Sequence, residues 1–96
     1  MYKLSEASAR DIENILERSL LDFGHIQTEQ YYHSLKNCLE LLASNPGMGN
    51  SAEDIQAGYR RFPHQSHIIF YTVSESDIFI VRILHKSMDI PDHFDK

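Results

Sequence analysis

The chain has 96 residues, of which 42% are hydrophobic and 24% charged, and its formal net charge is −5. This length fits a single domain, residues 1–96, and the composition excludes a disordered chain. The acidic balance argues against nonspecific nucleic-acid binding, which depends on cations that contact phosphates. One cysteine excludes an intramolecular disulfide, and no apolar run approaches the ~20 residues of a membrane span. Since a signal-peptide pattern is also absent, we expect a soluble, cytoplasmic protein.

The first half of the chain has the pattern of a short strand followed by two helices. Residues 2–4 are typical of a strand, and Ser5 is suited to cap a helix. Apolar residues then recur at helical spacing at positions 12, 15, 16, 20 and 23, and Gly24 marks a helix end. A second helix is predicted from about residue 25 to residue 44, because Asn45-Pro46-Gly47 breaks a helix. The short connection at Gly24 predicts an antiparallel helical hairpin.

The second half predicts a loop over residues 47–57 and then three strands. The strands are placed at 58–62, where Pro63 ends the first of them, at 67–73 and at 78–84, with a hairpin turn at 74–77. The last two are apolar on consecutive residues, which predicts burial on both faces, or under helices on one face and a partner on the other. The fold class is therefore α+β, in the order β-α-α-β-β-β. The helical hairpin should pack on one face of a small antiparallel sheet, with the first strand beside the later ones.

Six histidines raise the question of a metal site. No Cys/His cluster has zinc spacing, and the H-E-x-x-H pattern is absent. His64 and His67 are three residues apart at a strand start, so we expect them on opposite faces. The glycine cluster at residues 47–49 follows a helix, which is the wrong order for a phosphate site at a helix N-terminus. We therefore expect neither a metal nor a cofactor.

The best acid–base candidates are Arg82 and His85 at the end of the last strand, with Tyr71 on the neighbouring strand. A histidine acting as general base or acid, with an arginine stabilising charge, could cleave RNA. The preferred interpretation is structural, with Arg82 in an ion pair and His85 at the strand end. Residues 55–73 hold two arginines, two histidines and no acid, which indicates either a basic patch or a solvated outer sheet face.

Four phrases in this order resemble the RelE/ParE superfamily of toxins, and within it the ParE branch. They are residues 41–49 (LLASNPGMG), 58–63 (GYRRFP), 67–71 (HIIFY) and 81–89 (VRILHKSMD), at matching separations. The resemblance, which extends from Tyr2 to Asp89, implies the fold described above. It also implies an antitoxin that wraps the toxin with its C-terminal part and binds DNA with its N-terminal part. The implied target is DNA gyrase, trapped on cleaved DNA so that replication is blocked, with no catalysis by the toxin itself.

The ribonuclease branch of the superfamily shares this fold and implies an mRNA endonuclease with Arg82 and His85 as catalytic residues. Its members are basic and place several Lys and Arg residues, with a late tyrosine or histidine, around one sheet face. This sequence is acidic and has no tyrosine after Tyr71, which disfavours that branch, although His85 keeps it open. A third hypothesis is a copy that has lost toxicity and acts only with its antitoxin.

The gyrase hypothesis places target binding at the sheet edge and the tail, where arginine and methionine anchors would supply interface energy. The expected target-binding residues are Arg60, Arg61, Arg82, His85, Lys86 and Met88. The apolar strands and two adjacent tyrosines exceed what one helical hairpin can cover, so a partner peptide should bury the remainder. The expected antitoxin-binding residues are Leu20, Phe23, Tyr31 and Tyr32. The expected partners are a ParD-like antitoxin, in a hetero-oligomer, and DNA gyrase, with DNA reached only through them and no membrane.

Overall fold

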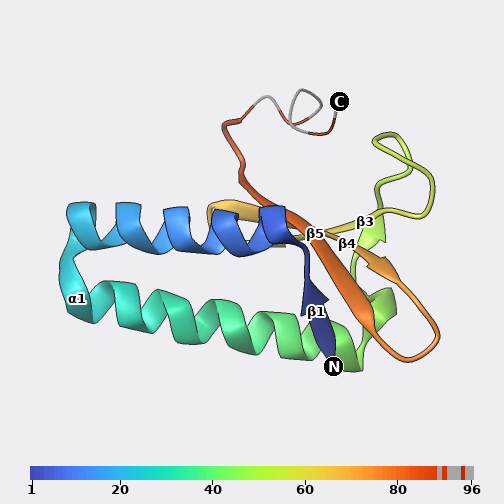
Figure 1. Ribbon diagram of the computed structural model, residues 1–96, viewed down its shortest axis with the longest axis horizontal. Helices are drawn as coiled ribbons and strands as arrows, with labels where there is room; N and C mark the ends of the chain where they lie inside the picture. The colour runs from blue at the N-terminus through green and yellow to red at the C-terminus, as the bar shows by residue number, and fades with distance from the viewer. Residues whose placement is uncertain (89, 91–93, 95–96) are drawn as a thin grey trace.

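The computed structural model describes residues 1–88, 90 and 94, arranged as a helical hairpin on one face of a five-stranded sheet (Figure 1). The elements are β1 (Tyr2–Leu4), α1 (Glu6–Ser44), the 3-10 helix η1 (Pro46–Met48), β2 (Asn50–Ser51), β3 (Arg60–His64), β4 (His67–Val73) and β5 (Ile78–His85). None of the helices in this described part of the chain combines the length and apolar character that a bilayer span needs.

Gly24 divides α1 into two arms, residues 6–23 and residues 25–44, which lie side by side and antiparallel (Figure 1). Its φ of 87° lies in the region that glycine adopts without the strain a side chain would cause. At the start of the first arm, the Ser5 Oγ accepts a hydrogen bond from the backbone N–H of Ser8 at 2.9 Å. The predicted cap, the turn at Gly24 and the helix end at Ser44 are therefore confirmed.

The strand order in the sheet is β1-β5-β4-β3-β2. The strands β2 to β5 pair antiparallel, as predicted. The prediction that the first strand joins the later ones is also confirmed, but β1 pairs with β5 in parallel, with Tyr2 opposite Ile78. The sheet is therefore mixed. After α1 the chain enters the sheet at the opposite edge with β2, and the antiparallel strands β2 to β5 bring it back beside β1.

Two details of the predicted strands were wrong. The segment predicted as loop at residues 47–57 contains most of η1 and all of β2. The strand predicted at 58–62 runs from Arg60 to His64, and Pro63 lies inside it, opposite Ile68. Because β2 pairs with β3 only at Arg60 and Arg61, Pro63 lies at an open edge of the described sheet, where no neighbouring strand needs the N–H that proline lacks.

The core has two parts, one on each face of the sheet. The part that faces α1 consists of Leu35, Cys38, Leu39, Leu42, Ile69, Tyr71, Ile78, Ile80 and Ile83. On the opposite face, Ala52, Phe70 and Leu84 are buried. Their cover is made by Ile55, Tyr59, Ile68, Ile90 and Phe94. The chain therefore covers with its own residues part of the sheet face that the sequence interpretation assigned to a partner.

A β-bulge at Val81 changes the side-chain order along β5. Ile80 and Arg82 lie opposite Tyr71 and Phe70, which are consecutive in β4, so Val81 has no partner there. One extra residue moves every later side chain to the other face. Residues 83 and 85 therefore face α1, and residue 84 faces the outer side.

Candidate functional site

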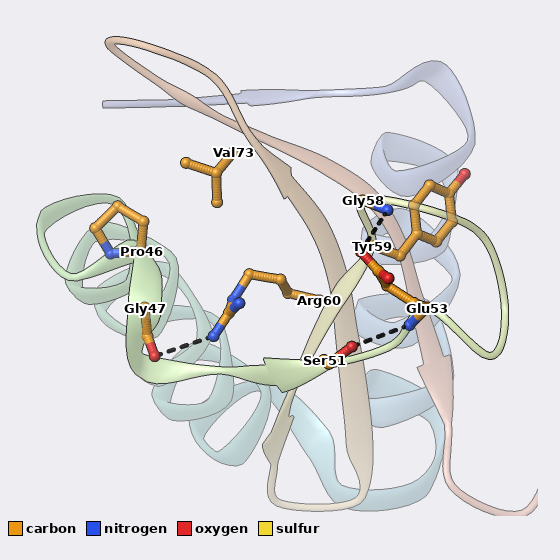
Figure 2. Close-up of a pocket in the computed structure, with 8 residues that line it drawn as sticks. All are labelled: Pro46, Gly47, Ser51, Glu53, Gly58, Tyr59, Arg60 and Val73. Atoms are coloured by element: carbon orange, nitrogen blue, oxygen red, sulfur yellow. Dashed lines mark hydrogen bonds between the residues drawn. The ribbon is translucent and has the colours of Figure 1, made fainter.

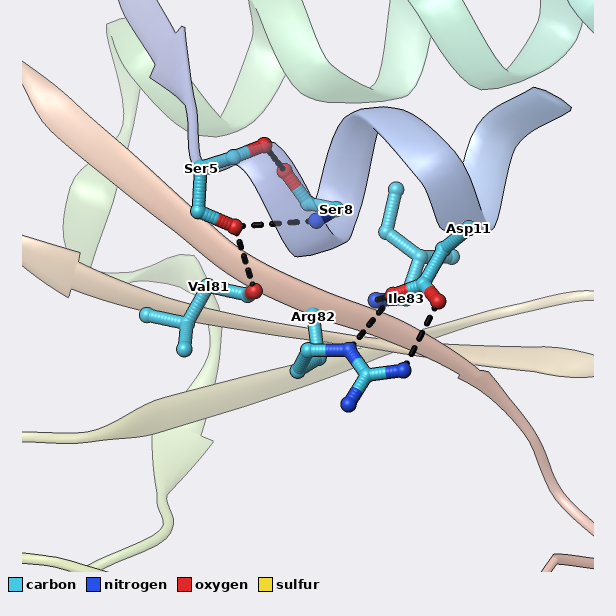
Figure 3. Close-up of polar contacts among 6 residues, drawn as sticks. All are labelled: Ser5, Ser8, Asp11, Val81, Arg82 and Ile83. Atoms are coloured by element: carbon cyan, nitrogen blue, oxygen red, sulfur yellow. Dashed lines mark hydrogen bonds and ion pairs between the residues drawn. The ribbon is translucent and has the colours of Figure 1, made fainter. Parts of the chain in front are cut away.

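The part of β5 that extends beyond β1 has no neighbouring strand on that side among the described residues, and the first turns of α1 lie against its edge (Figure 3). The carboxylate of Asp11 accepts hydrogen bonds from Nε and Nη2 of Arg82, both at 2.8 Å. It also accepts one from the backbone N–H of Ile83 at 2.9 Å, and the Ser5 Oγ donates to the Val81 carbonyl at 2.7 Å. These side chains satisfy backbone groups that a neighbouring strand would otherwise pair.

Arg82 thus has the structural role that the sequence analysis preferred for it. Its side chain is 22% exposed and that of Asp11 is 11% exposed, so the ion pair is largely shielded from water. The hydrogen bonds from Arg82 to Asp11 raise the pKa of the arginine. A guanidinium held in this way is poorly placed to stabilise a phosphoryl transition state as well, which weakens the RNA-cleavage hypothesis.

Tyr71, the third acid–base candidate, is fully buried. Its hydroxyl donates to the Pro46 carbonyl at 2.7 Å and accepts from the Gly49 N–H at 3.0 Å. It therefore fixes the loop that follows α1. The predicted group of Arg82, His85 and Tyr71 does not come together.

Three histidines and a tyrosine gather where β3, β4 and β5 meet the second arm of α1. We call Tyr31, His64, His67 and His85 the imidazole cluster. The Tyr31 Oη lies 2.8 Å from the His67 Nδ1, and the rings of His67 and His85 are 5.3 Å apart at an angle of 87°. The His64 ring lies 5.6 Å from that of Tyr31, and its Nε2 is 3.2 Å from the Ser34 Oγ.

The expectation that His64 and His67 lie on opposite faces was wrong. The two residues are direct cross-strand partners on either side of the turn at residues 65–66. Partners in an antiparallel pair point to the same face, so both imidazoles face Tyr31. Because Pro63 was interpreted as the end of the strand, the hairpin between residues 60–64 and 67–73 was not predicted. A connection of only two residues between two strands is the pattern that indicates such a hairpin.

Burial is the main cause that lowers the pKa of His67 to about 4. The neighbouring His85 and His64 lower it further, and Asp11 opposes them. Burial also lowers the pKa of His64 and raises the pKa of Tyr31 to about 12. The hydrogen bond between Tyr31 and His67 therefore joins two neutral groups at neutral pH. Within residues 1–88, 90 and 94, no three His, Cys, Asp or Glu side chains are placed to hold a metal ion.

A groove of about 1030 Å³ lies between the two arms of α1 and the ends of the strands. Its lining residues are Asp11, Asn14, Ile15, Arg18, Ser19, Asp22, Phe23, Gln27, Gln30, Tyr31, Ser34, Gln65, Ser66, His67, Ile83, His85, Ser87 and Met88. The carboxylates in this lining are paired with arginines, Asp11 with Arg82 and Asp22 with Arg18. Among the described residues, no carboxylate lies within ion-pair distance of the two imidazoles in the lining.

Arg60 and Arg61 contact the segments that surround β2. Arg60 points toward Gly47 and donates to its carbonyl at 3.2 Å, and it also donates to the carbonyl of Gly49 (Figure 2). It lines a pocket of about 400 Å³ between the loop and the start of β3. Arg61 forms an ion pair with Asp54, and this hydrogen bond lowers the pKa of the carboxyl.

The six residues predicted to bind the target therefore do not form one surface. Arg61 and Arg82 stand in one row across the sheet, on either side of Phe70 in β4. Each of the three arginines makes intramolecular hydrogen bonds. The exposed residues His85, Lys86 and Met88 lie at the end of β5 and directly after it. Of the six predicted target-binding residues, these three are neighbours in the chain and all exposed.

Of the four residues predicted to bind an antitoxin, Phe23 and Tyr31 line the groove, whereas Leu20 and Tyr32 are not part of its lining. Leu20 and Phe23, at the end of the first arm, are 40% and 61% exposed, whereas Tyr31 belongs to the imidazole cluster. Tyr32 is exposed and its ring lies 5.7 Å from that of His33. Two more apolar residues at the hairpin connection, Leu21 and Ile26, are exposed and were not among the predicted residues.

Comparisons with known proteins agree over nearly the whole chain. The family described as ParE toxin of type II toxin-antitoxin system, parDE, matches residues 2–90. A relative called Toxin ParE1 from Caulobacter vibrioides is 37% identical over 92 residues, which are 96% of this chain and 95% of the relative. A protein of the same name from Mycobacterium tuberculosis is 37% identical over 90 residues, which are 93% of this chain and 92% of the relative.

A solved structure described as the chromosomal ParDE TA system from P. aeruginosa has a similar fold. It superposes with a TM-score of 0.75 over 88% of this chain and 92% of the other, at 19% sequence identity. At this identity, the likeness is evidence for the fold alone.

Proposed function

Because the chain belongs to the ParE toxin family of type II toxin–antitoxin systems, we propose that it inhibits DNA gyrase and is neutralised by a ParD-like antitoxin. The toxin traps the gyrase–DNA cleavage complex and blocks replication in the cytoplasm. The observation that carries this proposal is the family match over residues 2–90, together with relatives of nearly the same length. The description of the matched family as the toxin of a type II toxin-antitoxin system, parDE, supports the antitoxin as partner.

The arrangement of charged side chains supports inhibition by binding, without catalysis by the toxin. Arg82 and Tyr71 are held by intramolecular hydrogen bonds, so the acid–base group needed for RNA cleavage is incomplete. The end of β5 and the residues after it instead expose an imidazole, an ammonium and a thioether, from His85, Lys86 and Met88. Methionine is enriched in protein interfaces, and a rim cation adds electrostatic complementarity. We place the gyrase contact there.

A plasmid supercoiling reaction with gyrase and the purified toxin tests the proposal. After the enzyme is denatured, linear DNA is the expected product, because a trapped cleavage complex leaves both strands cut. The double variant Lys86→Ala/Met88→Ala should restore supercoiling, whereas Lys36→Ala, an exposed lysine on the second arm of α1, should act like the unchanged toxin. Undisturbed supercoiling in the presence of folded toxin would contradict gyrase inhibition.

One observation favours mRNA cleavage as the second candidate function. The rings of His67 and His85 are 5.3 Å apart, and a half-buried neutral imidazole beside an exposed one is an arrangement suited to paired base and acid catalysis. Defined cuts in mRNA of a translating extract, lost in His85→Asn, would support this function. Intact mRNA would remove it, and absence of growth arrest on induction would indicate a copy that acts only with its antitoxin.

A further inference from the structure

The ionisable side chains that line the groove indicate what kind of ligand it can bind. From the first arm, Asp11 and the Arg18–Asp22 pair face it, and both carboxylates are already paired with arginines. From β4 and β5, it is lined by His67 and His85. Protonation of these imidazoles adds positive charge, and the carboxylates that line the groove within residues 1–88, 90 and 94 already have arginine partners.

In the empty groove, the neighbouring imidazoles disfavour a positive charge on His67. The rings of His67 and His85 are 5.3 Å apart, and His64 is the cross-strand partner of His67. A charge on either of these rings therefore disfavours a charge on His67. Burial acts in the same direction and lowers the pKa of His67 to about 4, although Asp11 partly opposes this. An incoming carboxylate would reverse the balance, because an anion beside an imidazole favours the charged form.

The groove lining also contains apolar side chains, which can contact the apolar residues of a peptide. Ile15 and Phe23 of the first arm and Ile83 and Met88 at the end of β5 lie in the same groove as the imidazoles. An amphipathic segment with a carboxylate among apolar residues is complementary to this combination.

We propose that the groove binds an acidic, amphipathic segment of the antitoxin together with a proton, so that the toxin–antitoxin complex tightens as the pH falls. This inference rests on the proposed neutralisation by an antitoxin. The carboxylate of the partner contacts His67 or His85 and stabilises the imidazolium. Acidification within the range where histidine titrates therefore favours the complex, until the partner carboxylate itself is protonated.

Calorimetric titration of the folded toxin with its purified ParD-like antitoxin tests this linkage between about pH 7.5 and about pH 5. Repeating the titration in buffers of different ionisation enthalpy counts the protons taken up. We expect an uptake that approaches one proton per complex near the acidic end, where Kd should fall by up to about tenfold per pH unit. His67→Asn and His85→Asn should each reduce the uptake. Asparagine keeps a polar group near the position of Nδ1.

His33→Asn is the matched control, because His33 is exposed on the second arm and does not line the groove. It should bind with unchanged proton uptake. A Kd that does not change with pH, or equal uptake in all three variants, overturns the inference while the antitoxin remains the partner. If one cluster variant does not fold, the other provides the comparison, since His85 is exposed and His67 is not. Absence of binding at every pH by folded toxin overturns both the neutralisation and this inference.

Discussion

The guanidinium of Arg82 donates two hydrogen bonds of 2.8 Å to the carboxylate of Asp11 and so fastens the first helical arm to β5. From the sequence, Arg82 was expected both to form an ion pair and to bind the target, and the structure shows the ion pair. A loss of toxicity in an Arg82 variant therefore has two possible causes, which a stability measurement separates.

Arg82→Ala should lower the free energy of unfolding by about 2 kcal/mol, because a shielded carboxylate loses its charged partner. Urea denaturation of both proteins measures the difference. The control is Arg18→Ala, whose pair with Asp22 is largely exposed and should contribute less than about 0.5 kcal/mol. Equal losses in the two variants would contradict the structural role of Arg82.

Lys86→Ala/Met88→Ala should abolish growth arrest and leave stability within about 0.5 kcal/mol, because both side chains are exposed. Induction in a growing culture and urea denaturation of the purified variant check the two parts. This variant is more informative than truncation after Leu84, which would also remove the contact of Phe94 with Phe70 at 5.0 Å between ring centroids. A folded double variant that still arrests growth would exclude this surface.

Gly49→Ala should destabilise the protein by about 1–3 kcal/mol through overpacking. A Cβ at Gly49 would lie 2.4 Å from the Tyr71 Oη and 2.7 Å from the Arg61 carbonyl oxygen, whereas one at Gly47 would meet nothing within 4 Å. Thermal unfolding compares Gly49→Ala with Gly47→Ala. Similar melting temperatures for the two variants would show that the loop does not approach Tyr71 this closely.

Stability should decrease as the pH falls from about 6.5 toward about 4, in part because of His67. The folded pKa of His67 lies below its ordinary value, so the unfolded chain binds the proton first, and acidification favours unfolding. Burial of His64 acts in the same direction. Urea denaturation at several pH values should show a weaker dependence for His67→Asn than for the unchanged protein. The exposed control His33→Asn should retain the full dependence, and an unchanged slope in His67→Asn would contradict the burial of this imidazole.

Most of the elements were predictable because their signals are local. The cap at Ser5, the positive φ at Gly24 and the break after Ser44 each depend on a few neighbouring residues, and the structure agrees at all three. The strands at 67–73 and 78–85 likewise follow from β-branched and aromatic runs joined by a short turn.

The candidate site was predictable only in part, because its contacts join distant residues. Arg82 and Asp11 are 71 positions apart, and no periodicity in either segment indicates the pair. The imidazole cluster depends on the tight turn between His64 and His67 and on the unpaired Val81. Parallel pairing of β1 and the cover supplied by Phe94 depend in the same way on the completed fold.

The bulge at Val81 restricts which insertions and deletions this segment of the toxin can tolerate. Deleting one residue there would restore strict alternation and exchange the inward and outward positions of residues 82–85. Leu84 would turn toward the helices, and His85 would leave the groove. The number of residues between Ile80 and His85 is therefore under stronger constraint than the identity of Val81. Substitution at this position should be tolerated where a one-residue insertion or deletion is not, so partner recognition depends on the length of this segment.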